Sequence, residues 1–228
     1  QTVNAIAPGV GSGINNISIY VGGDFATVNG VAVKNLAEIG CSVLGGNVGS
    51  GTSNGSAPMN TWLPNPNGPV TSLAWSGNSS ASTLIVGGAF TTMDTRPNTS
   101  TPFTTLVRHR LAKIIIGGVT STTLPVVDGT WDPNAGRTVR TVSRDTTLGT
   151  VTVGGDFLVL GGKTRNNLAE FDPNTGVTPW NPGTDGLVAA LAFRSGTVYV
   201  GGGFTNAGGQ ARANLAAIDG TTGAVTSW

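Results

Sequence analysis

Short runs of apolar and β-branched residues, separated by turns rich in Gly, Asn, Asp and Ser, recur along the whole chain. In the last quarter of the sequence these runs are Val188–Phe193, Thr197–Val200, Asn214–Asp219 and Ala224–Trp228. The preceding part contains the matching set Val139–Ser143, Thr150–Val153, Asn167–Asp172 and Val177–Trp180. Runs of this length predict short antiparallel strands joined in a meander, with a loop between the second and third strands. Because the runs are nearly continuous rather than alternating, we expect both faces of each sheet to be covered.

One motif marks the second predicted strand of every unit. It reads Val-Gly-Gly-x-Phe and occurs at Val21–Phe25, Val86–Phe90, Val153–Phe157 and Val200–Phe204. A Leu-Ala pair and then a Trp follow each copy, and the Trp residues are Trp62, Trp131, Trp180 and Trp228. We expect the glycines either to adopt positive φ or to let a neighbouring sheet approach, with the Phe filling the gap. A repeat of this size indicates stacked units that bury one another's apolar faces.

The repeat predicts an all-β fold, a β-propeller built of four-stranded antiparallel blades. The single domain covers residues 1–228, and its units span approximately residues 3–62, 70–131, 139–180 and 187–228. Each internal Trp begins a Trp-x-Pro linker of constant length to the next strand-opening Val, as a constant rotation between blades requires. A β-sandwich is the rival fold, but it does not need the same motif in every unit.

The phase of the repeat bears on whether the blades close into a ring. Val3 lies where a strand-opening Val is expected, and Trp228 lies where a linker begins. No strand from one end of the chain is therefore expected to complete the blade at the other end and so close a ring. Two arrangements remain, a four-bladed ring and an arc of a larger propeller or array, and the phase favours the arc.

Composition narrows the functional classes. Charged residues make up 10% of the chain and the net charge is +1, so nothing indicates a nucleic-acid partner. No run approaches the length of a membrane span, which argues against membrane insertion. Cys41 is the single cysteine and allows no internal disulfide. A surface rich in Asn, Thr, Ser and Gly predicts an extracellular or cell-surface location, and the start at Gln1 fits a processed or excised segment.

Catalytic and metal sites are not supported by the residue pattern. His109 is the single histidine, and no nucleophile lies at a motif spacing from it. Asp24 and Asp156 correspond to Ala89 and Gly203 in the other units, so no ring of carboxylates is maintained. We therefore expect no enzyme activity, no metal and no cofactor.

Several further residues that could carry chemistry have simpler structural interpretations. The segment from Asp172 to Gly176 could suggest calcium, but it is more simply a hairpin turn. Arg108–Arg110 aligns near Arg165 and Arg212, and we expect salt bridges between blades or solvation there. The repeated Trp residues are expected to pack each blade against its neighbour.

The candidate binding residues lie in or beside the long loops of units one and two. The connections between first and second strands, and those between third and fourth strands, emerge on one face of a meander, and most inserted residues gather there. The inserts are rich in hydrogen-bonding side chains, which suit a glycan or a protein partner. Alternatively, these loops are flexible and have no binding role, or they mediate self-association or contacts with neighbouring domains. The candidate residues are Asn15, Asn16, Asn47, Asn54, Trp75 and Asn78.

The segment Val200–Asp219, closed by Thr222-Gly223 and Trp228, resembles the bacterial delta-60 repeat, and similar units occur in fungal cortical surface proteins. The resemblance covers all four units, although Ala89 and Gly203 replace the motif's Asp and units one and two carry insertions. It implies a β-propeller on a cell-surface or fibre-like protein, with adhesion or scaffolding as its role. The segment from Ile218 to Trp228 also resembles repeats of pyrroloquinoline-quinone dehydrogenases.

These observations predict a non-catalytic extracellular or cell-surface scaffold that binds a glycan or protein partner through the loops of units one and two. The first alternative is a structural subunit of a surface fibre or envelope assembly. The second is a quinone- or metal-dependent propeller enzyme, against which the single histidine argues.

Overall fold

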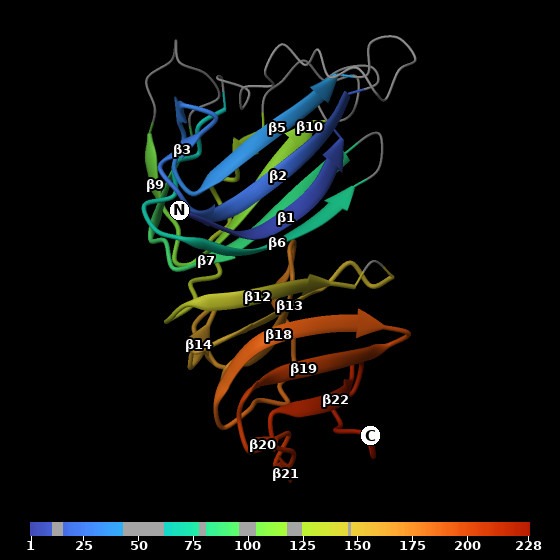
Figure 1. Cartoon of the computed structure of the whole chain (residues 1–228). Helices are drawn as coiled ribbons and strands as arrows, with labels where there is room; N and C mark the ends of the chain where they lie inside the picture. Colours follow the sequence, from blue (N-terminus) through green and yellow to red (C-terminus); the bar gives the residue numbers. More distant parts are fainter. Residues whose placement is uncertain (11–15, 43–61, 78–80, 96–103, 118–124, 146) are drawn as a thin grey trace.

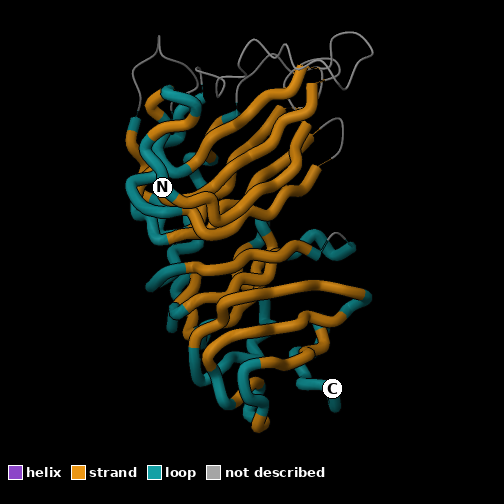
Figure 2. Tube along the Cα trace, viewed as in Figure 1, coloured by secondary structure: helices purple, strands orange, loops and turns teal. Residues whose placement is uncertain are grey.

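The computed structural model describes residues 1–10, 16–42, 62–77, 81–95, 104–117, 125–145 and 147–228. These residues form strands, turns and loops, and no helix occurs among them (Figure 2). The prediction of an all-β fold is confirmed.

Four antiparallel sheets contain the predicted meanders in chain order. The first sheet has β1 (Thr2–Val10), β2 (Asn16–Asp24) and β5 (Leu36–Ser42). The second has β6 (Val70–Gly77), β7 (Ala81–Gly88), β10 (Leu111–Gly117) and β11 (Val126–Val127). The third has β12 (Val139–Arg144), β13 (Val151–Gly155), β16 (Leu168–Asp172) and β17 (Gly176–Val177). The fourth has β18 (Leu187–Arg194), β19 (Thr197–Gly203) and β22 (Leu215–Asp219).

The fourth strands of units three and four are shorter than the sequence predicts, and the corresponding segment of unit one lies outside the described residues. β17 ends at Val177 rather than Trp180, and residues 224–228 contribute a single bridge between Ile218 and Val225. In unit three the chain must leave the sheet for the next unit, where the Trp180 indole N–H donates to the carbonyl of Asp219 at 3.0 Å. A proline two residues after Trp180 cannot donate to a strand ladder, which also ends the pairing.

Each predicted loop between second and third strands contains a small two-stranded ribbon instead. The four ribbons are β3–β4 (Thr27–Val28, Val31–Ala32), β8–β9 (Thr92–Asp94, Thr105–Val107), β14–β15 (Val159–Leu160, Lys163–Thr164) and β20–β21 (Asn206–Ala207, Gln210–Ala211). The turns of the first, third and fourth ribbons are Asn29-Gly30, Gly161-Gly162 and Gly208-Gly209, with positive φ at both residues. Such dipeptides are strong hairpin signals, so this correction was available from the sequence.

The sheets follow one another in an open stack, with the first and fourth sheets at opposite ends (Figure 1). The first strands form the seam between units, because β1 contacts β6, β6 contacts β12 and β12 contacts β18. Three buried apolar clusters each join two consecutive sheets; in the first, Leu36 of unit one packs with Val70 and Phe90 of unit two. The sheets therefore bury one another's faces in the way that defines propeller blades, and the described residues form an arc rather than a closed ring.

The first glycine of each motif lies where the Val that opens the next unit makes its closest approach, and we call this position the seat. A Cβ added at Gly22, Gly87 or Gly154 would lie 2.4, 2.8 or 2.3 Å from a Cγ1 atom of the Val that opens the next unit. The second glycine is needed within its own sheet, because a Cβ at Gly23 would lie 2.0 Å from the Thr2 carbonyl oxygen. The expectation of close approach is thus confirmed, whereas none of these glycines has positive φ.

A β-bulge at the same register in every first strand adds a polar bond between units. The register shifts fall between Val3 and Ala5 and at the matching positions of β6, β12 and β18. The Asn4 amide in the first bulge donates to the Val70 carbonyl at 3.0 Å. Thr71 in the second bulge donates through Oγ1 to the Val139 carbonyl at 2.6 Å. The bulge therefore aims a side chain at the next sheet.

Changing Gly154 and Gly201 to alanine gives a matched test of this seat. Gly154→Ala should lower the free energy of unfolding by about 1–3 kcal/mol, because its methyl group overlaps Val188. Gly201→Ala should change it by less than about 0.5 kcal/mol, because the nearest atoms to its Cβ lie at 3.9 Å. Urea denaturation measures both, and equal effects would contradict the account of the seat.

Candidate functional site

Many polar residues of the repeat are used to hold the units together. The residue before each Leu-Ala pair has a left-handed backbone, with φ of 60° at Asn35 and 62° at Asn167. The side-chain amide of Asn35 donates to the Pro66 carbonyl, and that of Asn167 donates to the Thr184 carbonyl, each at 2.9 Å. Both acceptors lie in the linker to the next unit. These residues are therefore structural.

The repeated arginines also have a structural use, which differs from the expected salt bridges. Arg165 donates through Nη2 to the carbonyl of Thr178 at 2.7 Å, and Arg212 donates in the same way to Thr226 at 2.7 Å. Arg108 makes the matching bond to the Asp128 carbonyl. Because the fourth strands are short, these carbonyls have few strand partners, and the guanidinium groups satisfy them.

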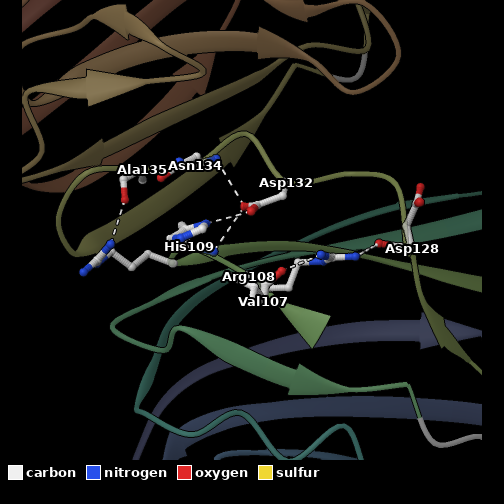
Figure 3. A network of polar contacts seen from close by, with 8 residues as sticks. Val107, Arg108, His109, Asp128, Asp132, Asn134 and Ala135 are labelled. Carbon is white, nitrogen blue, oxygen red and sulfur yellow. Dashed lines mark hydrogen bonds and ion pairs between the residues drawn. The ribbon is translucent and has the colours of Figure 1, made fainter. Parts of the chain in front are cut away.

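His109 anchors the linker between units two and three (Figure 3). Its Nδ1 lies 2.7 Å from Oδ2 of Asp132, and its backbone N–H donates to Oδ1 of the same carboxylate at 3.1 Å. Asp132 is the middle residue of the Trp-x-Pro linker and also accepts from the Asn134 N–H at 3.3 Å. These hydrogen bonds thus join the approach to β10 with the linker that follows the same unit.

The aspartates at strand ends cap turns, as predicted for the segment that begins at Asp172. Oδ1 of Asp172 accepts from the backbone N–H groups of Asn174 and Thr175 at 2.7 and 3.1 Å. Asp219 accepts from the Thr222 N–H in the same way, and this bond lowers the pKa of its carboxyl group. Among the described residues, no group of His, Cys, Asp and Glu side chains is placed to hold a metal ion.

Three of the four repeated tryptophans, Trp62, Trp131 and Trp180, pack between sheets as predicted, whereas Trp228 has 60% of its surface exposed. Trp62 is buried and meets Tyr20 edge-on, with the ring centroids 5.8 Å apart. Trp131 packs on Phe171 of the next unit at 5.1 Å. Their rings are therefore used in the core.

The structure places two of the predicted binding residues. Asn16 begins β2 and pairs with Ser42 of β5. Trp75 lies in β6 and stacks on Tyr20, with the ring centroids 5.8 Å apart and the planes 18° from parallel, so one of its faces is covered. Asn15, Asn47, Asn54 and Asn78 lie outside the described residues. The structure does not bring the candidates together into one described site.

A polar groove of about 310 Å³ lies between the second and third sheets, and sequence reasoning did not identify it. It is at the end of the sheets that carries the connections between first and second strands, which is the face predicted for recognition. It is over units two and three, whereas the prediction placed recognition over units one and two. Its lining residues are Ser76, Ser82, Thr83, Lys113, Arg144, Leu148, Gly149, Asp172, Pro173 and Asn174.

Lys113 is fixed at one wall of this groove. Its Nζ lies 2.8 Å from Oδ2 of Asp128 and donates to the Pro173 carbonyl at 3.5 Å. It also lies 5.9 Å from the centroid of the Trp131 ring, within cation–π range. Burial alone would raise the pKa of Asp128, but the hydrogen bonds from Lys113 and Thr130 outweigh it and lower that pKa to about 2. The Asp128 carboxyl group is therefore charged at neutral pH.

Arg144 is the less constrained cation of the groove. Burial lowers the pKa of its guanidinium group, and the charge of Asp172 opposes this effect. Arginine nevertheless stays protonated at neutral pH. Its Nε is buried and has no hydrogen-bond partner in the described part of the chain. The Nε atoms of Arg108, Arg165 and Arg212 are buried and unpaired in the same way, so this feature does not distinguish Arg144.

A second hollow of about 420 Å³ lies beside the first. The turn residues Pro173 and Asn174 line both hollows. Trp131 and Lys163 contribute to the second one and add an aromatic edge and a cation. Together the two hollows form a continuous polar surface around one hairpin turn, with hydroxyl, amide and cationic groups available to a partner.

The fold and this surface define a repeat protein of the β-propeller class. A family model described as a domain of unknown function (DUF5122) beta-propeller matches residues 149–174. The matched segment runs from just before β13 to the hairpin turn that lines both hollows. A comparison with curated proteins gives no significant match. The described residues include no helix with the length and apolar character needed to cross a membrane.

Removing the charge of Asp128 should destabilise the groove wall in a pH-dependent way. Because its pKa is lowered from 3.8 to about 2, its stabilising effect is complete above pH 3.8 and is lost as the pH falls toward 2. Asp128→Asn should lower the free energy of unfolding by about 1–2 kcal/mol at neutral pH, and the difference from wild type should shrink in acid.

Urea denaturation from neutral pH down to about 2 measures this difference. Asp24→Asn, on an exposed carboxylate at the end of β2, is the control and should have little effect at any pH. A destabilisation by Asp128→Asn that is equally large at neutral and acidic pH would contradict the assigned ion pair.

Proposed function

We propose that this chain is a non-catalytic β-propeller scaffold of the extracellular space or cell surface, which recognises a glycan at its loop-bearing face. The groove between the second and third sheets, lined by Lys113 and Arg144, is the described part of the recognition surface. The sequence predicts the long loops of units one and two on the same face, and most of their residues lie outside the described part of the chain. A protein partner is the second choice for this surface.

The candidate catalytic side chains make hydrogen bonds that stabilise the fold, which supports a scaffold rather than an enzyme. His109 is held by Asp132, and Asp172 and Asp219 are engaged in turns. Arg165 and Arg212 are committed to carbonyl groups of their own units. Acid–base catalysis would require such groups to converge on a reacting atom, and each of them instead fixes a turn, a strand end or a linker.

The observation that carries the proposal is the chemistry of the groove. Hydroxyl groups of Ser76 and Thr83, the amide of Asn174 and the guanidinium of Arg144 line one cavity. Sugar hydroxyls both donate and accept hydrogen bonds, and these side chains offer both. The two hollows give room for more than one sugar ring along the surface.

A glycan array followed by calorimetric titration of a binding glycan tests this assignment. Arg144→Met keeps the apolar stem and removes the charged donors, so it should weaken the affinity about tenfold or more, as expected for a charge-assisted hydrogen bond. Arg194→Met is the matched control, because Arg194 is exposed at the end of β18 and away from the groove.

Equal affinities for the two variants would move the recognition site away from the groove. A chain that binds no glycan on the array would contradict the glycan assignment. Retained binding of a surface protein in that case would favour the protein partner instead.

A further inference from the structure

The hairpin turn that follows the third strand differs between units three and four at one telling position. The turn is Asp172–Gly176 in unit three and Asp219–Gly223 in unit four. Both turns have the same length, begin with Asp and end with Gly. The second residue is Pro173 in unit three, whereas unit four has Gly220 there. The two turns can therefore be compared residue by residue.

In unit four the turn packs closely on its surroundings. The Gly220 N–H donates to the Gly196 carbonyl at 2.7 Å, and a Cβ at Gly220 would lie 2.9 Å from that oxygen. At the other end of the turn, a Cβ at Gly223 would lie 3.6 Å from Nε1 of Trp180. The indole N–H of Trp180 donates to the Asp219 carbonyl at 3.0 Å. The turn thus covers one edge of the Trp180 ring and accepts its hydrogen bond.

In unit three both contacts are missing. Pro173 has no N–H to donate to Gly149, which is the equivalent of Gly196, and these two residues line the groove instead. A Cβ at Gly176 would meet no atom within 4 Å, so the end of the turn does not reach Trp131, the equivalent of Trp180. Gly176 and Trp131 both line the second hollow. Both hollows therefore lie where the turn of unit four makes its contacts.

Trp131 differs from the other repeated tryptophans that are followed by a linker. Trp62 and Trp180 are buried, with 2% and 5% of their surfaces exposed, whereas Trp131 is only partly buried. The indole N–H of Trp131 makes no hydrogen bond within the described part of the chain, and its Nε1 is not among the buried unpaired atoms there. One donor of an otherwise structural residue is therefore open to a ligand.

The second hollow combines apolar and hydrogen-bonding side chains. Trp131, Pro133 and Val177 provide apolar surface, and Asn174 and Thr175 provide an amide and a hydroxyl group. A pyranose ring has the same division, because its faces carry C–H groups and its edge carries hydroxyl groups. Aromatic side chains with a polar group suit such a ligand, and ligand sites commonly join an apolar lining to a few polar groups.

We propose that the second hollow binds a pyranose ring, with the indole of Trp131 as its main contact. The inference rests on the proposed glycan recognition and extends it from the groove to a second site. The Trp131 N–H donates to a hydroxyl of the ring, and C–H groups of the ring pack against the indole and Pro133. Because Pro173 and Asn174 line both hollows, two linked sugars span this turn with one ring in each hollow. A linked pair therefore binds more tightly than either sugar alone.

Calorimetric titration tests the second site with two kinds of probe. The first is the shortest array glycan of two or more sugars that binds, and the second is the set of methyl glycosides of its separate sugars. Trp131→Phe keeps an aromatic ring against Phe171 but removes the N–H donor, so it should weaken binding of the linked glycan about fivefold or more. Trp228→Phe is the matched control, because Trp228 is exposed and packs on Tyr199 outside both hollows.

A second variant obstructs the hollow and leaves Trp131 in place. Thr175 is exposed at the hollow, so the larger side chain of Thr175→Tyr should reduce the affinity for the linked glycan to that for a single sugar. Thr221→Tyr, at an exposed position of the matching turn in unit four, should bind as wild type does. Circular dichroism melting checks that each variant is folded. The linked glycan should also change the tryptophan fluorescence of wild type, and Trp131→Phe should lose this change.

The outcomes distinguish this inference from the proposed function. If Arg144→Met weakens glycan binding while Trp131→Phe and Thr175→Tyr leave it unchanged, the second site is wrong and recognition by the groove stands. A separate sugar that binds wild type as tightly as the linked glycan would also overturn the second site. A chain that binds no glycan at all would overturn both proposals.

Discussion

The contact of a strand-opening valine with the first glycine of the preceding motif governs the arrangement of the sheets. Val70, Val139 and Val188 each fill the space that a Cβ at that glycine would occupy. The close approach brings the first strands together and lets one apolar cluster join two sheets. Without it, each short sheet would leave an apolar face in water, which a unit of this size cannot sustain.

The arc and the groove both follow from that contact. The packing of the third sheet on the second leaves a hollow at their ends, which side chains from both units line. Lys113 of unit two and Arg144 of unit three meet there in this way. The contacts at these glycines thus set the spacing of the sheets. The strand ends and turns provide the polar side chains of the groove, as in other folds that carry function on loops.

Much of the scaffold could be predicted from the sequence, because its signals are local and repeated. The Val-Gly-Gly-x-Phe motif identified the strand that receives the next sheet, and the packing role of Trp62 followed from its constant phase. The ribbons also have a local sequence signal, in dipeptides such as Gly208-Gly209 that favour a tight hairpin turn. The groove could not be predicted, because Ser76 and Asn174 come together only through the register of two sheets. The use of Arg165 likewise depends on where the fourth strand ends.

A double-mutant cycle between Gly87 and Val139 tests the central contact most directly. Gly87→Ala alone should clash with Val139, whose Cγ1 lies 2.8 Å from the added methyl group, and Val139→Ala alone should leave a cavity. Together the two changes should relieve each other, giving a coupling free energy of about 1 kcal/mol or more. Strictly additive effects would show that the two residues do not set the spacing of the sheets.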